Sequence, residues 1–454
     1  MTGILISVAA FAAALGVLVT VHEFGHFWVA RRLGVKVLRF SVGFGSPLWK
    51  RHFGRDRTEF VLAAIPLGGY VRMLDEREGD VDPREADRAF NRQPVATRLA
   101  VVAAGPVFNF LLAVFVYWIM FMAGVPGVRP VVGSVTPDSH AAQAGFKKGD
   151  EIVSVSGRKT VTWDAAVLDL LDGALNRRNV SVGVRTPAGD QRTLSLDLRH
   201  AGRLLDEGDL LHSIGMEPWR PTLPAVIEKT VPGSPAAKAG LEPGDKIVEA
   251  DGKPVSDWRQ WVKYLQARPG KTIQLTVLRA GKQLHIPLSV GKEKTDHGVI
   301  GKMGAYVRIP KNIDSKLRVV VRYGPAEAVA HAAGKTWDMT SLTLQTLWKM
   351  VLGQASVKNI SGPITIAEYA GSSARIGLVP FLGFLAVVSV SLAVLNLLPV
   401  PVLDGGHLMY YLIELFKGSP VSEQAQLMGQ RVGIAALAML MMLALYNDIA
   451  RLLT

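Results

Sequence analysis

Two histidines and a glutamate lie within five consecutive residues near the start of the chain. The segment His22-Glu23-Phe24-Gly25-His26 is an H-E-x-x-H motif. On a helix, residues i and i+4 lie on one face one turn apart, so both imidazoles can reach one metal ion. Glu23 lies near that face, close enough to take a proton from a water at the metal. The motif therefore predicts a hydrolytic metal site with His22 and His26 as ligands.

Composition constrains the metal and its third ligand. The chain contains no cysteine, so a zinc site has to use histidine and carboxylate ligands. Two histidines leave room for one more protein ligand and an open position for water. The best remaining carboxylate is Asp404, within N-L-L-P-V-P-V-L-D-G-G-H at 396–407, and His407 is a lower-ranked rival. The alternative interpretation is that Asp404 only begins the next helix.

Four apolar stretches are long enough to cross a bilayer, which takes roughly 20 helical residues. They cover residues 4–21, 99–125, 376–395 and about 427–446. A signal peptide is the alternative for the first stretch, but nothing basic precedes Arg31, as such a peptide would require. The H-E-x-x-H motif continues directly from the first stretch. Charged groups at membrane depth are costly, on the order of 2–3 kcal/mol each, unless a metal or a partner compensates.

The third stretch leads directly into the segment 396–407. Pro399 and Pro401 cannot continue a helix, so the backbone has to unwind there. Unwound backbone at membrane depth is tolerated only against protein or a wet cavity. An active site beside Asp404 would provide such a cavity.

Charge distribution predicts the orientation. The net charge of the chain is +13, but no Lys/Arg-rich run of the kind that tracks phosphates is present, so we expect no nucleic-acid partner. Basic residues flank the loop 31–98, which predicts that this loop is cytoplasmic. The termini and the long segment 126–375 should then lie outside. The basic residues beside the first two spans are Arg31, Arg32, Lys36, Arg39, Arg88, Arg92 and Arg98.

The outer segment contains an internal repeat. Residues 131–163 match residues 226–258 with 13 identities in 33 positions, including the pattern S-x-A-A-x-A-G-[FL]-x-x-G-D-x-I-V. The small residues suit a short helix that stops at its glycine, and Gly-Asp then turns into an apolar strand. The repeat resembles the PDZ domain, as found in bacterial membrane and periplasmic proteases. The alternative is two unrelated β-rich domains. Neither copy has a clear G-L-G-F loop, so capture of peptide tails is not supported.

Residues 325–352 are neither PDZ-like nor uniformly apolar. Trp337, Leu344 and Trp348 alternate with lysine and polar residues in a pattern typical of a helix that lies on a membrane surface. A soluble connector is the alternative that the pattern leaves open.

Taken together, these motifs resemble the site-2 protease family over almost the whole chain, in the same order. The resemblance rests on H-E-F-G-H at a first span, N-x-x-P-x-P-x-L-D-G-G at a later span and the tandem PDZ-like units between spans. Gly105-Pro106-x-x-Asn109 and Ser361-Gly362-Pro363-Ile364 also fit the family.

The resemblance implies Zn²⁺ bound by His22, His26 and Asp404, with Glu23 as general base and Asn396 near the substrate or oxyanion. It implies a multi-pass protein of the bacterial inner membrane, with periplasmic PDZ-like domains and an active site toward the cytoplasmic side. The implied activity is that of a metalloendopeptidase that cuts transmembrane segments of single-pass proteins after a first cut. Anti-sigma factors and signal-peptide remnants are the implied substrates, reached within the lipid bilayer.

The cytoplasmic loop offers further candidates for substrate handling. Residues 58–73 look strand-like, and a strand edge could pair with an unwound substrate by β-addition. The resemblance implies a membrane-dipping hairpin here, although a small cytoplasmic sheet fits the residues equally well. The candidate substrate-handling residues are Asn396, Pro399, Gly43, Gly45, Gly68 and Gly69.

The predicted fold is thus a multi-pass α-helical membrane protein, with about four transmembrane helices and two PDZ-like α/β domains between the second and third. The PDZ-like pair is expected to screen substrates by size. A scaffold with a structural metal would need four protein ligands rather than three, and a transporter would show an inverted repeat between span pairs. The predicted membrane regions are a first span at 1–30, a second at 98–126, a third at 376–410 and a fourth-span region at 411–454. The predicted regions between them are a cytoplasmic loop at 31–97, two PDZ-like domains at 127–220 and 221–310, and an amphipathic segment at 311–375.

Overall fold

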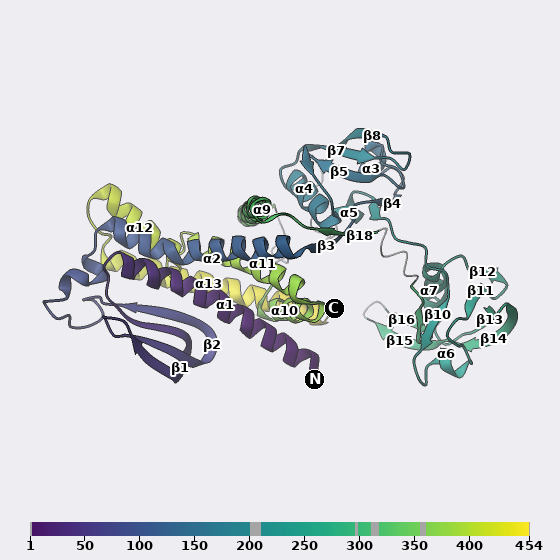
Figure 1. Cartoon of the computed structure of the whole chain (residues 1–454), viewed down its shortest axis with the longest axis horizontal. Coiled ribbons are helices and arrows are strands. Elements are labelled where there is room, and N and C mark those ends of the chain that lie inside the picture. Colours follow the sequence, from purple (N-terminus) through teal and green to yellow (C-terminus); the bar gives the residue numbers. More distant parts are fainter. Residues whose placement is uncertain (1, 200–209, 296–297, 310–316, 355–359, 454) are drawn as a thin grey trace. The chain divides into compact units, whose positions relative to one another are not determined.

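The computed structural model describes residues 2–199, 210–295, 298–309, 317–354 and 360–453 (Figure 1). The chain divides into two units. One comprises Met1–Val125 with Val320–Leu453, and the other comprises Pro126–Val319.

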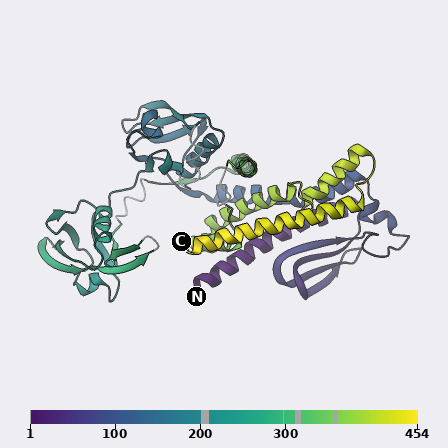
Figure 2. The ribbon, with the colours of Figure 1, turned by 180° about the vertical axis from the view of Figure 1, so that it is seen from behind.

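The first unit is a helical bundle. Four of its helices are long and apolar enough to cross a membrane, namely α1, α2, α11 and α13. Figures 1 and 2 show these four running side by side. The expectation of a multi-pass α-helical membrane protein is confirmed. The helices of this unit are α1 Thr2–Arg32, α2 Val95–Ala123, α9 Pro325–Val351, α10 Pro363–Ile376, α11 Leu378–Leu397, α12 Asp404–Lys417 and α13 Glu423–Leu453.

Helix α2 is the centre of this bundle, because it contacts α1, α9, α11 and α12. Leu18 of α1, Tyr117 of α2 and Leu385 of α11 share one buried cluster. The backbones of α1 and α2 come very close at Gly25, where an added Cβ would lie 2.5 Å from the carbonyl oxygen of Ala104. The glycine inside the H-E-x-x-H motif therefore lets α2 approach the two histidines.

The third span does not continue into the D-G-G segment as one helix. Helix α11 ends at Leu397, and α12 begins at Asp404. Between them, Val402 has φ +132°, a strained conformation for a β-branched residue. A Cβ on Gly405 would lie 2.1 Å from the carbonyl oxygen of Leu398. The two prolines and the glycines thus fold the chain into a tight turn that ends at Asp404.

A strongly twisted sheet follows α1. It consists of β1 (Val37–Phe53) and β2 (Thr58–Met73), which pair in an antiparallel manner. Residues 39–42 pair with both 59–62 and 69–72, whereas 47–53 pair with 58–63. The two long strands therefore act as four segments, and the segment Gly69–Met73 forms one edge of the sheet. Strand β2 contacts α1, so the sheet lies alongside this helix. Two short 3-10 turns, η1 Ala86–Arg88 and η2 Phe90–Arg92, connect it to α2.

Helix α9 lies across the spans instead of along them. Both ribbon views show α9 end-on while α1, α2 and α13 run across the picture (Figures 1 and 2). One face of α9, with Ala328 and Ala332, is buried. Trp337 and Trp348 are exposed to 70% and 64%. That residues 325–352 form an amphipathic helix on the membrane surface stays a prediction.

The second unit contains two PDZ-like domains with matching strand orders. The four-stranded sheet of the first has the order β6-β5-β7-β8, and that of the second has the order β12-β11-β13-β14. The elements of the first are β4 Val132–Val135, α3 His140–Ala144, β5 Glu151–Val155, β6 Arg158–Lys159, α4 Trp163–Leu175, β7 Asn179–Arg185, β8 Gln191–Asp197, α5 Leu210–Ser213 and β9 Met216–Pro218. Those of the second are β10 Ile227–Thr230, α6 Pro235–Lys238, β11 Lys246–Ala250, β12 Lys253–Pro254, α7 Trp258–Gln266, β13 Thr272–Arg279, β14 Lys282–Ser289, β15 Gly291–Thr295, β16 Gly298–Lys302 and β17 Ala305–Val307.

The sequence repeat corresponds to equivalent structural devices in the two domains. The Ser139 hydroxyl accepts a hydrogen bond from the Ala142 amide, and Ser234 caps its own short helix in the same way through Ala237. Each domain has its own buried core, around Ile152 in the first and around Ile247 and Trp261 in the second. Two further strands, β3 Val125–Val128 and β18 Arg318–Val321, are the segments at which the chain passes from one unit to the other.

Candidate metal centre and active site

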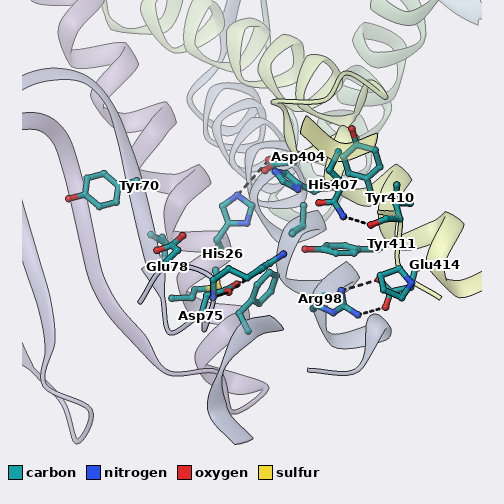
Figure 3. Close-up of a pocket in the computed structure, with 18 of the residues that line it drawn as sticks. His26, Tyr70, Asp75, Glu78, Arg98, Asp404, His407, Tyr410, Tyr411 and Glu414 are labelled. Carbon is teal, nitrogen blue, oxygen red and sulfur yellow. Dashed lines mark hydrogen bonds and ion pairs between the residues drawn. The ribbon is translucent and has the colours of Figure 1, made fainter. Parts of the chain in front are cut away.

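Three side chains converge at the break between α11 and α12. The Nε2 atoms of His22 and His26 are 3.3 Å apart. They lie 3.1 Å and 3.5 Å from Oδ2 of Asp404, respectively. Ligands about 2.0–2.1 Å from a tetrahedral zinc ion are separated from one another by about 3.3 Å. The triangle formed by these three atoms therefore has the size of one face of a zinc tetrahedron, and Figure 3 shows His26 facing Asp404.

The chemistry of the three atoms also fits zinc. His22 and His26 are each only 8% exposed, and the buried Oδ2 of Asp404 has no hydrogen bond in the described part of the chain. Two imidazole nitrogens and a carboxylate oxygen are acceptors that repel one another unless a cation or a proton lies between them. Three protein ligands of this type, with a fourth position open, are the donor set of catalytic zinc sites.

Helix α2 contacts the second ring nitrogen, Nδ1, of both histidines. Nδ1 of His26 lies 2.8 Å from the carbonyl oxygen of Val101, and Nδ1 of His22 lies 3.2 Å from Nδ2 of Asn109. Between these two contacts, a Cβ on Gly105 would come within 2.3 Å of Nε2 of His26. The pattern Gly105-Pro106-x-x-Asn109 repeats the i, i+4 spacing of the histidines, and that spacing is the sequence signal that could have indicated these roles.

Glu23 lies on the wall of a cavity of about 450 Å³ that also contains the three candidate ligands. The edge segment of β2 forms another part of this wall, through Tyr70 and Val71. Gly69 makes the approach possible, because a Cβ there would lie 3.2 Å from Cγ of Glu23 and 2.6 Å from the carbonyl oxygen of Ser41. The edge segment of β2 thus runs directly past the candidate general base.

Much of the remaining cavity wall is polar or charged, and Met73, Phe90 and Val102 add apolar parts to it (Figure 3). Arg98 donates to both carboxylate oxygens of Glu414, at 2.6 and 3.1 Å, and its guanidinium lies over the ring of Tyr411. Burial raises the pKa of Asp75, but the hydrogen bonds from Arg77 outweigh burial and hold this pKa below its usual range. A chamber lined by ionised pairs is suited to hold water next to the metal centre.

The other candidates from the sequence lie in different places. His407 lines the cavity near Asp404 but is not part of the three-residue cluster. Asn396 lies half-buried on the last turn of α11 and is not among the described residues that line the cavity. Pro399 is exposed and borders an apolar groove along α12.

The four glycine candidates all belong to the β1–β2 sheet. Gly43, Gly45 and Gly68 have positive φ angles of 90°, 86° and 125°. They bend the two strands at the positions where the pairing changes register. Only Gly69 contacts α1, beside Glu23.

The chain is similar to known proteins over almost its whole length. The family model described as "Peptidase family M50" matches residues 10–440, a range that includes all three candidate ligands. "Regulator of sigma-E protease RseP" of Salmonella typhimurium (strain 14028s) is 46% identical over the full length of both chains, and the Escherichia coli K12 protein of the same name is 45% identical, also over the full length of both.

Two further similarities concern activity and fold. "Putative zinc metalloprotease NMA0084" of Neisseria meningitidis is 45% identical, covering 98% of this chain and 99% of the relative. The crystal structure of the PDZ domain of the SdrC-like protein Lin2157 from Listeria innocua matches with 18% identity and a TM-score of 0.17, covering 19% of this chain and 96% of that domain. By its family match and its relatives, this chain belongs to peptidase family M50, the site-2 protease family, and is a zinc metalloprotease.

Proposed function

We propose that this protein is an intramembrane endopeptidase that hydrolyses a peptide bond within the transmembrane segment of single-pass membrane proteins. The observation that carries the proposal is the set of three ligand atoms, 3.1 to 3.5 Å apart, buried beside Glu23 within a bundle of apolar helices. His22, His26 and Asp404 hold the zinc ion in this proposal.

The chemistry follows from this arrangement. Zinc bound here supplies Lewis acidity to the attacking water and to the scissile carbonyl. Glu23 accepts the proton of the attacking water and later delivers it to the leaving amine. The charged chamber around Arg98 and Arg77 keeps water available at this depth. Asn396 is proposed to donate to the substrate or to the oxyanion, which requires the substrate to reach the last turn of α11.

Substrate presentation is proposed to use the edge of the sheet. A transmembrane helix cannot be cut while its backbone hydrogen bonds are intact, so the substrate has to unwind at the site. The edge segment Gly69–Met73 lies beside Glu23 and is proposed to pair with an unwound segment by β-addition. Gly43, Gly45 and Gly68 shape the sheet that offers this edge, and Pro399 keeps the neighbouring backbone unwound.

We further propose an orientation for the protein in the bacterial inner membrane. The loop 31–97 and the mouth of the cavity face the cytoplasm, which agrees with the basic residues beside the first two spans. The PDZ-like domains, 127–220 and 221–310, face the periplasm. They screen substrates by size and pass those already shortened by a first protease. Deletion of 127–310 should permit cleavage of full-length substrates, and unchanged selectivity after deletion would contradict the screening role.

The proposed substrates follow from the relatives. Several of them carry the name "Regulator of sigma-E protease". We therefore propose membrane-anchored anti-sigma factors as one substrate class, with a role in a stress response, and remnants of signal peptides as another.

The test is cleavage of a single-span model substrate by wild type and by Glu23→Gln, with the zinc content of both measured. We expect cleavage to be lost and zinc to be retained in the variant. Glu368→Gln is a matched control, because Glu368 is an exposed glutamate on α10, remote from the metal cluster. Equal cleavage by both proteins would remove Glu23 from the mechanism. Absence of cleavage by either protein, with zinc bound, would favour a scaffold with a structural metal.

A further inference from the structure

The two histidines of the metal centre differ in what holds their second ring nitrogen. Nδ1 of His26 faces the carbonyl oxygen of Val101 at 2.8 Å. A carbonyl only accepts hydrogen bonds, so Nδ1 carries the proton and Nε2 keeps its lone pair for a metal. The tautomer of His26 is therefore set by the backbone of α2.

The tautomer of His22 depends on a side chain instead. Nδ1 of His22 faces the amide of Asn109, with Nδ2 of Asn109 3.2 Å away. Asn109 is fully buried, and its Oδ1 has no hydrogen-bond partner in the described part of the chain. An amide can present either a donor or an acceptor to the ring, because its oxygen and nitrogen have nearly the same shape.

The two amide orientations have opposite consequences for the metal site. When Nδ2 donates to Nδ1, the ring proton lies on Nε2, the atom 3.1 Å from Oδ2 of Asp404, and can donate to that carboxylate. In this state the metal position is closed by a hydrogen bond. When the amide turns by 180°, the buried Oδ1 accepts the Nδ1 proton, and the lone pair of Nε2 is free for a metal.

We propose that Asn109 is a positioning residue for His22. Its turned amide accepts a hydrogen bond from Nδ1–H of His22, and the lone pair of Nε2 is then free to bind the metal. This inference rests on the proposed function only in taking His22 as a metal ligand. The backbone carbonyl of Asn109 makes a separate hydrogen bond, which it accepts from Ser389 Oγ of α11 at 2.7 Å. Metal ligands of this kind usually donate their other ring N–H to an oxygen, and loss of that oxygen typically weakens metal binding by about 10–100-fold.

The test measures zinc affinity by competition with a chelator, in full-length protein that carries Glu23→Gln and therefore does not cut itself or contaminants. Asn109→Leu keeps the size of the side chain but removes the acceptor, and we expect zinc binding to weaken about 10–100-fold. Asn109→Asp keeps an acceptor and has no donor when ionised, so affinity should stay within about tenfold of the parent. Ser389→Ala is the control, because it removes a buried hydrogen bond of the same residue without touching its amide.

The outcomes separate this proposal from the proposed function. Parental affinity in Asn109→Leu would overturn the positioning role, and so would an Asp variant as weak as the Leu variant. Equal weakening by Ser389→Ala would show that general packing, not the acceptor, supports zinc, and would also overturn it. If the Glu23→Gln parent itself binds no zinc, the metal centre fails and the proposed function fails with it.

Discussion

Gly105 of α2 lies so close to His26 of α1 that a single methyl group would not fit between them. An added Cβ would be 2.3 Å from Nε2 and 2.6 Å from Cε1 of the His26 ring, and 2.7 Å from Cε1 of His22. The two histidines thus rest against bare helix backbone, and the close packing of α1 on α2 fixes the direction of both rings.

Gly105→Ala should therefore disrupt the metal centre. The methyl group has to displace His26 or separate the two helices, so we expect loss of bound zinc and of cleavage. Zinc content of the purified protein is the measurement. Gly16→Ala on α1 is the control, since nothing lies within 4 Å of its added Cβ and alanine favours the helix. Full zinc occupancy in Gly105→Ala would contradict the described packing.

The third ligand can be distinguished from its rival with two variants. Oδ2 of Asp404 lies within 3.1 to 3.5 Å of both histidines, whereas His407 lines the cavity outside the cluster. We expect Asp404→Ala to lose zinc, because only two ligands remain, and His407→Ala to retain it. Metal analysis of both variants after identical purification tests this. The reverse result would make His407 the ligand.

The edge of β2 beside Glu23 can be perturbed without changing a ligand. A Cβ at position 69 would lie 2.6 Å from the carbonyl oxygen of Ser41 and 3.2 Å from Cγ of Glu23, so Gly69→Ala should displace the edge segment from its place between β1 and α1. We expect cleavage of a single-span substrate to fall at least tenfold, equivalent to about 1.4 kcal/mol in the barrier, while zinc stays bound. Gly34→Ala is the control, because Gly34 also has a positive φ, of 88°, but lies outside the sheet and its Cβ would meet nothing within 4 Å, so this variant should suffer only backbone strain of about 1–2 kcal/mol. Similar losses in both variants would argue against a specific role for the edge.

A buried ion pair stabilises the second PDZ-like domain. Asp245 is fully buried and accepts two hydrogen bonds of 2.7 Å from Arg279. Burial raises the pKa of Asp245, but the hydrogen bonds from Arg279 and from the amide of Glu242 outweigh burial, so this pKa is lowered. A lowered pKa in the folded state means that the stabilisation is present above the unfolded pKa, about 3.9, and is lost as the pH falls through the folded value.

Arg279→Ala should therefore lower the local stability of this domain by about 2 kcal/mol at neutral pH. The variant loses the bonds that outweigh burial, so burial raises the pKa of Asp245 there, and the difference from wild type should narrow as the pH falls and Asp245 takes up a proton. This difference in local stability is measured by hydrogen exchange of β11 and β13 in the full-length protein, corrected for intrinsic exchange rates. The first PDZ-like domain serves as the internal control. A difference that grows as the pH falls would contradict the assigned pKa direction.

The C-terminal helix holds the start of α10. Asp448 of α13 accepts hydrogen bonds from the amides of Gly362, Ile364 and Thr365, at 2.9, 2.9 and 3.2 Å. It thus caps a helix whose own N-cap is a glycine without a side chain. Asp448→Ala should destabilise this helix start by about 1–2 kcal/mol, and Asp448→Asn should do so less. Hydrogen exchange of residues 362–366 in wild type and in both variants measures this order of stability. Equal protection in all three proteins would contradict the role of Asp448 as a cap.

Much of the local structure could be predicted directly from the sequence. The H-E-x-x-H spacing needs only a helix to place His22 and His26 on one face. Apolar length predicts the four membrane helices, and the repeated S-x-A-A-x-A-G pattern predicts two similar domains with a short helix that stops at its glycine. These features depend on neighbours in the chain, so periodicity and turn chemistry are sufficient to predict them.

Other relationships depend on residues that are distant in the sequence. The sequence marked Asn109 and Gly105 as unusual residues in an apolar span, but only the packing of α2 on α1 places them against the histidines. Likewise, Ser361-Gly362-Pro363-Ile364 was noticeable as a motif, whereas its cap, Asp448, lies on another helix and has no local signature.

The sequence by itself thus determined the type of chemistry, the presence of spans and repeats, and the identity of the candidate ligands. The tertiary structure decided that the Asp404 carboxylate, rather than His407, completes the triangle with the two histidines, that Asn396 is not among the described residues lining the cavity, and that an edge segment of β2 passes Glu23. The physical reason is that helix periodicity and turn preferences act over a few residues. The distance between two side chains on separate elements depends instead on how closely those elements pack, and here glycines at 25, 69, 105 and 405 set that closeness.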